Sequence, residues 1–197
     1  MLALAGTVWL IHLASTTADA KTIASVSVYG VTLVLLYTAS TLYHSVRGQA
    51  KNWLRTCDHL SIYLLIAGSY TPFCLISLQG TWGWSLFGLI WALAMVGMLQ
   101  EWYCKQSARI WSLVIYAVMG WLALIATQPL LQALGTSGFA WLLTGGLLYS
   151  IGVIFYVLDE RVAHFHGVWH LFVLAGSSAH FVTIWRYVIW PITQPAQ

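Results

Sequence analysis

Charge is scarce in this chain of 197 residues, of which only 7% are charged while 60% are hydrophobic. A soluble globular domain carries about 25% charged residues. With this few charged residues, the polar surface is too small to cover a water-soluble fold. The sequence therefore predicts an integral membrane protein. The net charge of +3 rests on so few residues that no nucleic-acid partner is expected. The 12 tryptophans and 10 tyrosines fit a membrane protein, because amphipathic aromatic side chains favour the bilayer interfaces.

The cysteines lack any pattern that would predict a disulfide. Cys57, Cys74 and Cys104 form neither a C-x-x-C motif nor a paired framework. Cys57 is kept as a lesser metal-ligand candidate because it adjoins Asp58. The first 20 residues end in an A-x-A-like sequence but lack the basic residue with which a secretory signal normally starts. They therefore favour a short first transmembrane helix over a signal peptide.

Polar and charged residues divide the apolar sequence into seven segments. About 20 apolar residues are needed to cross the hydrocarbon core, and unpaired backbone groups are not tolerated in lipid, so each segment is expected to be helical. Glycine-containing stretches at 77–83 and 135–138 predict tight turns. With no repeat and no second domain, residues 1–197 predict one all-α, seven-transmembrane helix bundle. The predicted spans are approximately 2–17, 22–45, 58–78, 82–100, 108–127, 134–158 and 166–190.

The positive residues set the predicted orientation. The loops after spans two, four and six hold six of the eight lysines and arginines: Arg47, Lys51, Arg55, Lys105, Arg109 and Arg161. The opposite side holds only Lys21 and Arg186. Because cytoplasmic loops are enriched in positive residues, this distribution predicts a cytoplasmic N-terminus and an outside C-terminus in the inner membrane.

Polar residues distant in sequence fall at the predicted cytoplasmic ends of three spans. Span two leaves the membrane through Ser40 and His44, span three enters it at Asp58, and span seven enters it at His166 and His170. The predicted topology places all of them at one depth. Ionisable groups within spans are costly and usually functional, so their convergence predicts a site.

A zinc site is the chemistry that these residues favour. His166 and His170, at positions i and i+4, project from one helix face, and His44 would supply a third ligand. Three histidines leave the fourth tetrahedral position for water, as in catalytic zinc sites. Asp58 could accept a hydrogen bond from that water as a general base, and Ser40 could stabilise an oxyanion. The structural alternatives are hydrogen-bonded interfacial histidines, an aspartate that stabilises a helix N-terminus, and a serine bonded to its own helix.

The other histidines are weaker candidates. His180 lies ten residues beyond His170, about 15 Å deeper along a helix, and is interpreted as a buried polar contact or proton-relay group. His59 points about 100° away from Asp58 on the helix. His164, in the loop before span seven, is kept as an alternative to the first histidine of the H-x3-H pair.

Long blocks of the chain resemble the bacterial haemolysin III family, within the superfamily of the progestin and adipoQ receptors and the alkaline ceramidases. The resemblance is carried by ASTLYHS (39–45), CDHLSIYLLIAGSYTPF (57–73), YAVMGW (116–121), GGLLYSIGVIFY (145–156) and HGVWHLFVLAGSSAHF (166–181). It implies seven helices with the N-terminus inside. It also implies that His44, His166 and His170 bind zinc, that Asp58 holds the metal-bound water, and that Ser40 belongs to the same site. Relatives of this kind act on lipid amides such as ceramide, or are receptors with proposed ceramidase activity.

Three functional hypotheses follow from these residues. The leading one is a zinc-dependent membrane hydrolase that cleaves a lipid amide or ester, with membrane lipids as its partners. The first alternative is a membrane-state sensor or regulator in which zinc is structural. The second is a lytic pore, against which the absence of a continuous polar stripe on any span argues.

Overall fold

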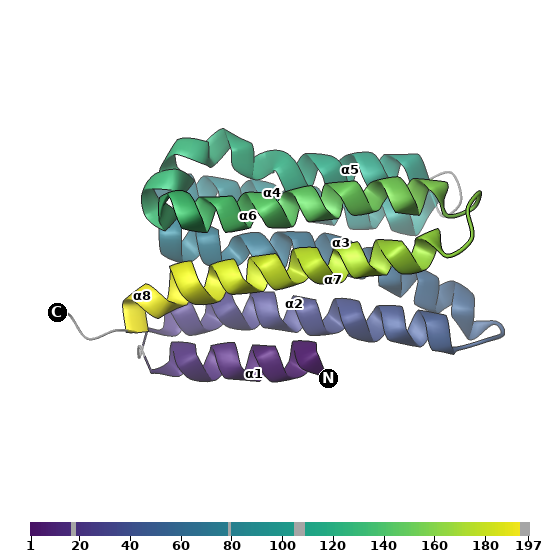
Figure 1. Ribbon diagram of the computed structural model, residues 1–197, viewed down its shortest axis with the longest axis horizontal. Coiled ribbons are helices and arrows are strands. Elements are labelled where there is room, and N and C mark those ends of the chain that lie inside the picture. Colours follow the sequence, from purple (N-terminus) through teal and green to yellow (C-terminus); the bar gives the residue numbers. More distant parts are fainter. Residues whose placement is uncertain (17–18, 79, 105–108, 194–197) are drawn as a thin grey trace. The chain divides into compact units, whose positions relative to one another are not determined.

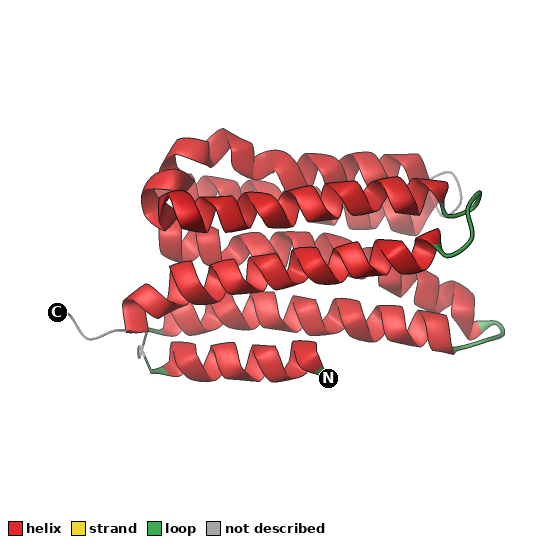
Figure 2. Cartoon of the chain, viewed as in Figure 1, coloured by secondary structure: helices red, strands yellow, loops and turns green. Residues whose placement is uncertain are grey.

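A computed structural model describes residues 1–16, 19–78, 80–104 and 109–193, and these contain helices and no strand (Figures 1 and 2). The side chains of Cys104 and Arg109 and all of Lys105, on which part of the sequence analysis rests, lie outside this description. The elements are α1 (Leu2–Ser15), α2 (Ala20–Ser45), α3 (Ala50–Pro72), the π-helix η1 (Phe73–Leu78), α4 (Gly80–Cys104), α5 (Arg109–Trp121), the 3-10 helix η2 (Leu122–Ala126), α6 (Thr127–Leu158), α7 (Phe165–Thr183), the π-helix η3 (Ile184–Ile189) and α8 (Trp190–Thr193).

Five helical stretches among the described residues are long and apolar enough to cross a membrane, and Leu2–Ser15 is a shorter apolar helix. One of the five, Ile110–Leu158, has 49 residues. A straight α-helix of that length would extend about 70 Å, more than twice the roughly 30 Å of a hydrocarbon core. The predicted all-α membrane fold is confirmed, whereas the count of seven spans and the orientation of the termini stay predictions.

The structure agrees with the predicted positions of the two glycine turns but not with the predicted start of the third span. Gly80 and Gly135 have φ angles of 55° and 68°, so both predicted glycine turns contain the left-handed backbone that glycine accommodates. By contrast, α3 begins at Ala50, more than two turns before the predicted start of span three at residue 58. The predicted spans end at charged residues, but a helix can continue beyond the hydrocarbon core, where its charged side chains reach the headgroups and water. Asp58 therefore lies inside α3 and not in its first turn.

Two compact units make up the chain, Met1–Leu122 and Ala123–Gln194. In the first unit, α2 packs against α1 and α3. Thr7 of α1 donates a hydrogen bond to the carbonyl of Gly30 at 3.1 Å, and Gly68 of α3 lies against Thr32 of α2. Small residues let helix backbones approach closely in membranes, so glycine and threonine set the spacing of these three helices.

In the second unit, α6 and α7 pack along each other (Figure 1). The chain reverses direction between Leu158 and Phe165, so the two helices run antiparallel. Gly152 of α6 lies against Trp169 and Phe172 of α7, and Gly176 of α7 lies against the ring of Tyr149. Each helix thus offers a glycine to an aromatic side chain of the other.

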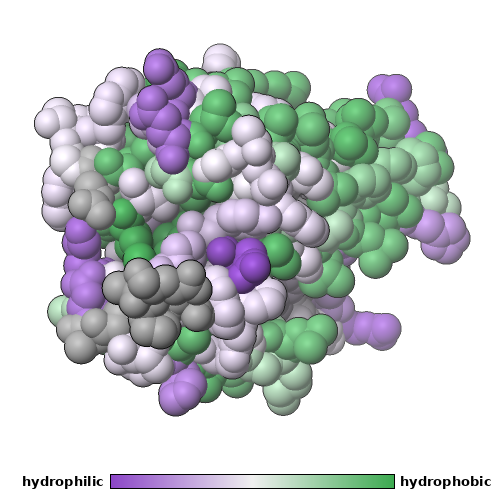
Figure 3. All heavy atoms as spheres, turned by 60° about the vertical axis from the view of Figure 1, so that its left-hand side comes forward, coloured by the Kyte–Doolittle hydropathy of each residue, from purple (hydrophilic) through white to green (hydrophobic). Residues whose placement is uncertain are grey.

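Large apolar side chains remain uncovered along several helices. Val31 of α2, Met95 of α4 and Leu171 of α7 are each more than half exposed, and Figure 3 shows broad hydrophobic areas on the visible face. Large contiguous apolar surface is unusual on soluble monomers. Lipid is the environment that such a surface requires.

Candidate metal centre

The first turns of α7 carry the histidine pair. His166 and His170 have ring centroids 4.8 Å apart and an interplanar angle of 80°, as the i, i+4 spacing predicts. The residue before the helix, His164, has a left-handed backbone with φ 70°, a conformation rare for residues other than glycine but enriched in histidine. This left-handed residue turns the chain into α7.

Asp159 orients the first histidine of the pair. Its Oδ2 lies 2.7 Å from Nδ1 of His166, and its side chain is only 12% exposed. An ionised carboxylate only accepts hydrogen bonds, so it selects the tautomer with the proton on Nδ1 and the lone pair on Nε2. Metal-binding histidines usually donate their second ring nitrogen to such a carboxylate. Asp159 was not among the predicted residues; the sequence signal for it is an acidic residue in the loop just before an H-x3-H pair.

In the first unit, the last turn of α2 carries His44. Its ring is tilted against that of Tyr43, with 4.7 Å between centroids, and Lys51 lies over the Tyr43 ring at 5.2 Å. Ser40 precedes His44 by one helical turn on the same helix. The predicted neighbours on α2 therefore share one helix face.

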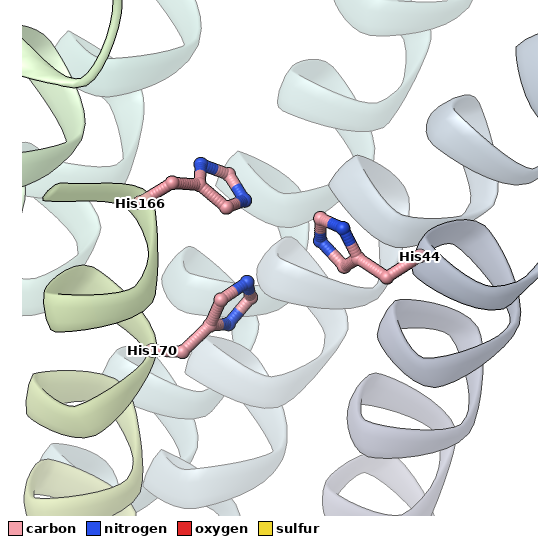
Figure 4. A group of neighbouring side chains, drawn as sticks. All are labelled: His44, His166 and His170. Atoms are coloured by element: carbon pink, nitrogen blue, oxygen red, sulfur yellow. The ribbon is translucent and has the colours of Figure 1, made fainter. Parts of the chain in front are cut away.

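One group of three potential metal ligands occurs among the described residues. It consists of His44, His166 and His170, each offering a ring nitrogen within 4.8 Å of the others (Figure 4). This is the histidine set selected from the sequence. Cys57 and Asp58 are not part of this group, and the role of Asp58 as a base stays a prediction.

Next to Asp58, a network of polar side chains joins α3, α4 and α5. Nδ1 of His59 lies 2.7 Å from Oε1 of Glu101, and the second oxygen of that carboxylate accepts a 2.7 Å hydrogen bond from Ser112. Tyr116 donates to the carbonyl of His59 at 3.1 Å. These contacts fix the backbone next to Asp58 and give His59 a structural partner. Glu101 was not among the predicted residues, because the fourth predicted span (82–100) ends one residue before it.

His180 makes a polar contact, as predicted for a histidine deep in the last span. Its Nε2 lies 3.3 Å from the carbonyl oxygen of Leu142, and its ring meets that of Tyr149 edge to face at 5.4 Å. The Tyr149 hydroxyl in turn hydrogen-bonds Ser177 at 2.8 Å. His180 therefore joins α6 to α7.

The chain is similar to a family of known proteins. A family model described as "Haemolysin-III related" matches residues 1–181. Hemolysin-3 homolog of Bacillus subtilis (strain 168) is 41% identical over 190 residues, which cover 96% of this chain and 89% of that protein. Hemolysin-3 of Bacillus cereus is 44% identical over 181 residues, covering 91% and 82%. Monocyte to macrophage differentiation factor of Homo sapiens is 32% identical over 169 residues, covering 82% and 69%. No solved structure gives a significant match.

The apolar helices and the family match define a multi-pass cell-membrane protein. More particularly, the chain belongs to the haemolysin III-related family. The resemblance inferred from the sequence motifs is confirmed.

Proposed function

We propose that this protein is a zinc-dependent hydrolase of the membrane that cleaves a lipid amide or ester. The observation that carries the proposal is the group of three histidines, His44, His166 and His170. Asp159 adds support, because it holds the tautomer of His166 that a metal ligand requires. Neutral imidazole nitrogens suit zinc, and three such ligands leave a coordination position open.

Each residue has a distinct task in the proposed reaction. A zinc ion bound by the three histidines would act as a Lewis acid and lower the pKa of water to about 7. The Asp58 carboxylate would accept the proton released during attack on the acyl carbon and pass it to the leaving group. The Ser40 hydroxyl would donate a hydrogen bond to the negative charge that develops on the acyl oxygen. The acyl chain of the substrate would lie among apolar side chains of the helices.

The ligand set is tested by the metal content of the purified full-length protein. Wild type is expected to hold one zinc per chain, and His44→Ala and His170→Ala are each expected to lose most of it. His12→Ala, on α1 and outside the histidine group, is the matched control and should keep its zinc. Unchanged zinc in both His44→Ala and His170→Ala would exclude this ligand set.

Asp58→Asn separates the hydrolase from a sensor with structural zinc. The amide side chain cannot take up the proton, so turnover should fall at least about 100-fold, the usual contribution of a general base, while zinc stays bound. Lipidomics of cells that lack or overproduce the protein identifies the substrate, and release of fatty acid from that lipid in proteoliposomes measures turnover. Full turnover in Asp58→Asn would refute the proposed base.

A further inference from the structure

A cleft of about 650 Å³ opens between the first turns of α3 and the last turn of α4, within the first unit. Its volume lies within the range of about 300–1,000 Å³ that small-molecule sites occupy. It is distinct from the histidine group, since none of the three histidines lines it. The lining residues are Gln49, Asn52, Trp53, Arg55, Thr56, Glu101 and Trp102.

The lining combines both signs of charge with aromatic faces. Arg55 is the cation, and its planar guanidinium suits the bidentate recognition of phosphate. Glu101 is the anion; its side chain is 7% exposed and is fixed by His59 and Ser112. Trp53 and Trp102 are 64% and 53% exposed, and tryptophan faces attract ammonium groups. The cleft thus offers a phosphate partner and an ammonium partner at once.

The place of the cleft in the fold selects a lipid over a soluble ligand. The lining residues of α3 belong to its first two turns, and those of α4 to its last turn. Both helices are long and apolar enough to cross a membrane, and we therefore expect their polar ends at the depth of the lipid headgroups. Tryptophan is enriched at that depth.

We propose that this cleft binds the headgroup of a zwitterionic phospholipid, phosphatidylethanolamine or phosphatidylcholine. Arg55 binds the phosphate, assisted by the amides of Gln49 and Asn52. The ammonium group lies between the tryptophan faces and the carboxylate of Glu101. An anionic lipid whose headgroup lacks an ammonium offers no cation to the tryptophan faces or to the Glu101 carboxylate, and is therefore bound more weakly.

Native mass spectrometry of the full-length protein in detergent tests the site. Phosphatidylethanolamine, phosphatidylcholine or phosphatidylglycerol is added to delipidated protein, and the retained lipid is counted. Wild type should retain one zwitterionic lipid in preference to phosphatidylglycerol. Arg55→Gln should weaken this binding about tenfold or more, since a hydrogen bond to a charged group is removed. Trp102→Leu should weaken it about three- to tenfold, since a cation–π contact is lost.

Two matched controls and a second readout keep the test independent of folding and of the zinc proposal. Arg47→Gln and Trp84→Leu change exposed residues outside the cleft and should bind lipid as wild type does. Asn52→Leu changes an exposed lining residue, and should weaken binding even if Arg55→Gln fails to fold. Zinc content should be unchanged in every cleft variant, so the two proposals fail separately.

Three results would overturn the proposal. One is equal retention of phosphatidylglycerol and the zwitterionic lipids by wild type. Another is wild-type binding by a folded Arg55→Gln or by Asn52→Leu. The third is displacement of the bound lipid by an equal concentration of water-soluble glycerophosphoethanolamine, which would make the cleft a site for a soluble phosphodiester.

Discussion

The contact between Gly68 and Thr32 predicts that a larger side chain at position 68 would disrupt the packing of α2 against α3. A Cβ added at Gly68 would lie 2.9 Å from Cβ and 3.0 Å from Cγ2 of Thr32, and closer still to its hydroxyl oxygen. Thr32 is 5% exposed and donates a 2.8 Å hydrogen bond to the Tyr29 carbonyl. Rotating the threonine would break this bond and would not move its Cβ, so Gly68→Ala must push the two helices apart.

The expected loss of stability in Gly68→Ala follows from two opposing effects. Overpacking a well-packed interior costs about 1–3 kcal/mol, and the position of the threonine Cβ places this case near the upper end. The higher helix propensity of alanine returns about 1 kcal/mol. The net loss is about 2 kcal/mol, which for a chain of this size lowers the Tm by about 4–8 °C.

Thermal unfolding in detergent measures the change against a matched control. Gly88 of α4 has no heavy atom within 4 Å of an added Cβ, so Gly88→Ala should leave the Tm unchanged or raise it. Adding Thr32→Ala to Gly68→Ala should recover part of the loss, because it removes the hydroxyl and the methyl group but keeps the Cβ. A Gly68→Ala protein as stable as wild type would refute the proposed packing, as would equal losses at Gly68 and Gly88.

Three further predictions concern other contacts. Glu101→Gln removes the charged partner of His59 and should cost about 1–3 kcal/mol in thermal unfolding; an unchanged Tm would mean that the pair adds no stability. Gly145→Ala would place a Cβ against the ring of the histidine that joins α6 to α7 and should lower the Tm, whereas Gly146→Ala, with nothing within 4 Å, should not. The pKa of Asp19 is lowered by hydrogen bonds from the Thr22 hydroxyl and the Lys21 backbone N–H, so its ionised form stabilises the start of α2 above about pH 4 and this stability is lost as the pH falls through the lowered pKa. Asp19→Ala should therefore lower the Tm at pH 7, and the difference from wild type should shrink on acidification; a difference that does not depend on pH would exclude a role for the charge.

Local patterns were enough to predict the class of fold and the histidine set. Hydropathy over about 20 residues reports a membrane helix directly, and the spacing of His166 and His170 fixes their shared helix face. His44 was selected because topology placed its helix end at the same depth. Each of these inferences depends on the sequence near one helix end and on the number of crossings before it.

The carboxylates that hold the histidines could not be predicted in this way. The contact of Asp159 with His166 depends on how a loop folds back on the first turn of α7. The contact of Glu101 with His59 joins residues 42 positions apart and depends on the rotation of α4 about its axis. Hydropathy carries no information about that rotation, because α4 is apolar on most of its circumference apart from its last turn. The early start of α3 was missed for a related reason, since charged residues end a membrane span without ending a helix.

The network around Glu101 also bears on how the protein enters the membrane during synthesis. Glu101 belongs to α4, whereas its partners His59 and Ser112 belong to α3 and α5. Because the chain is synthesised from its N-terminus, α3 reaches the membrane before α4, and α5 with Ser112 reaches it after α4. The carboxylate therefore enters with one partner and gains the second only when α5 arrives. Until then the acid at the end of α4 is incompletely paired. The network is therefore completed in the order in which α3, α4 and α5 are synthesised.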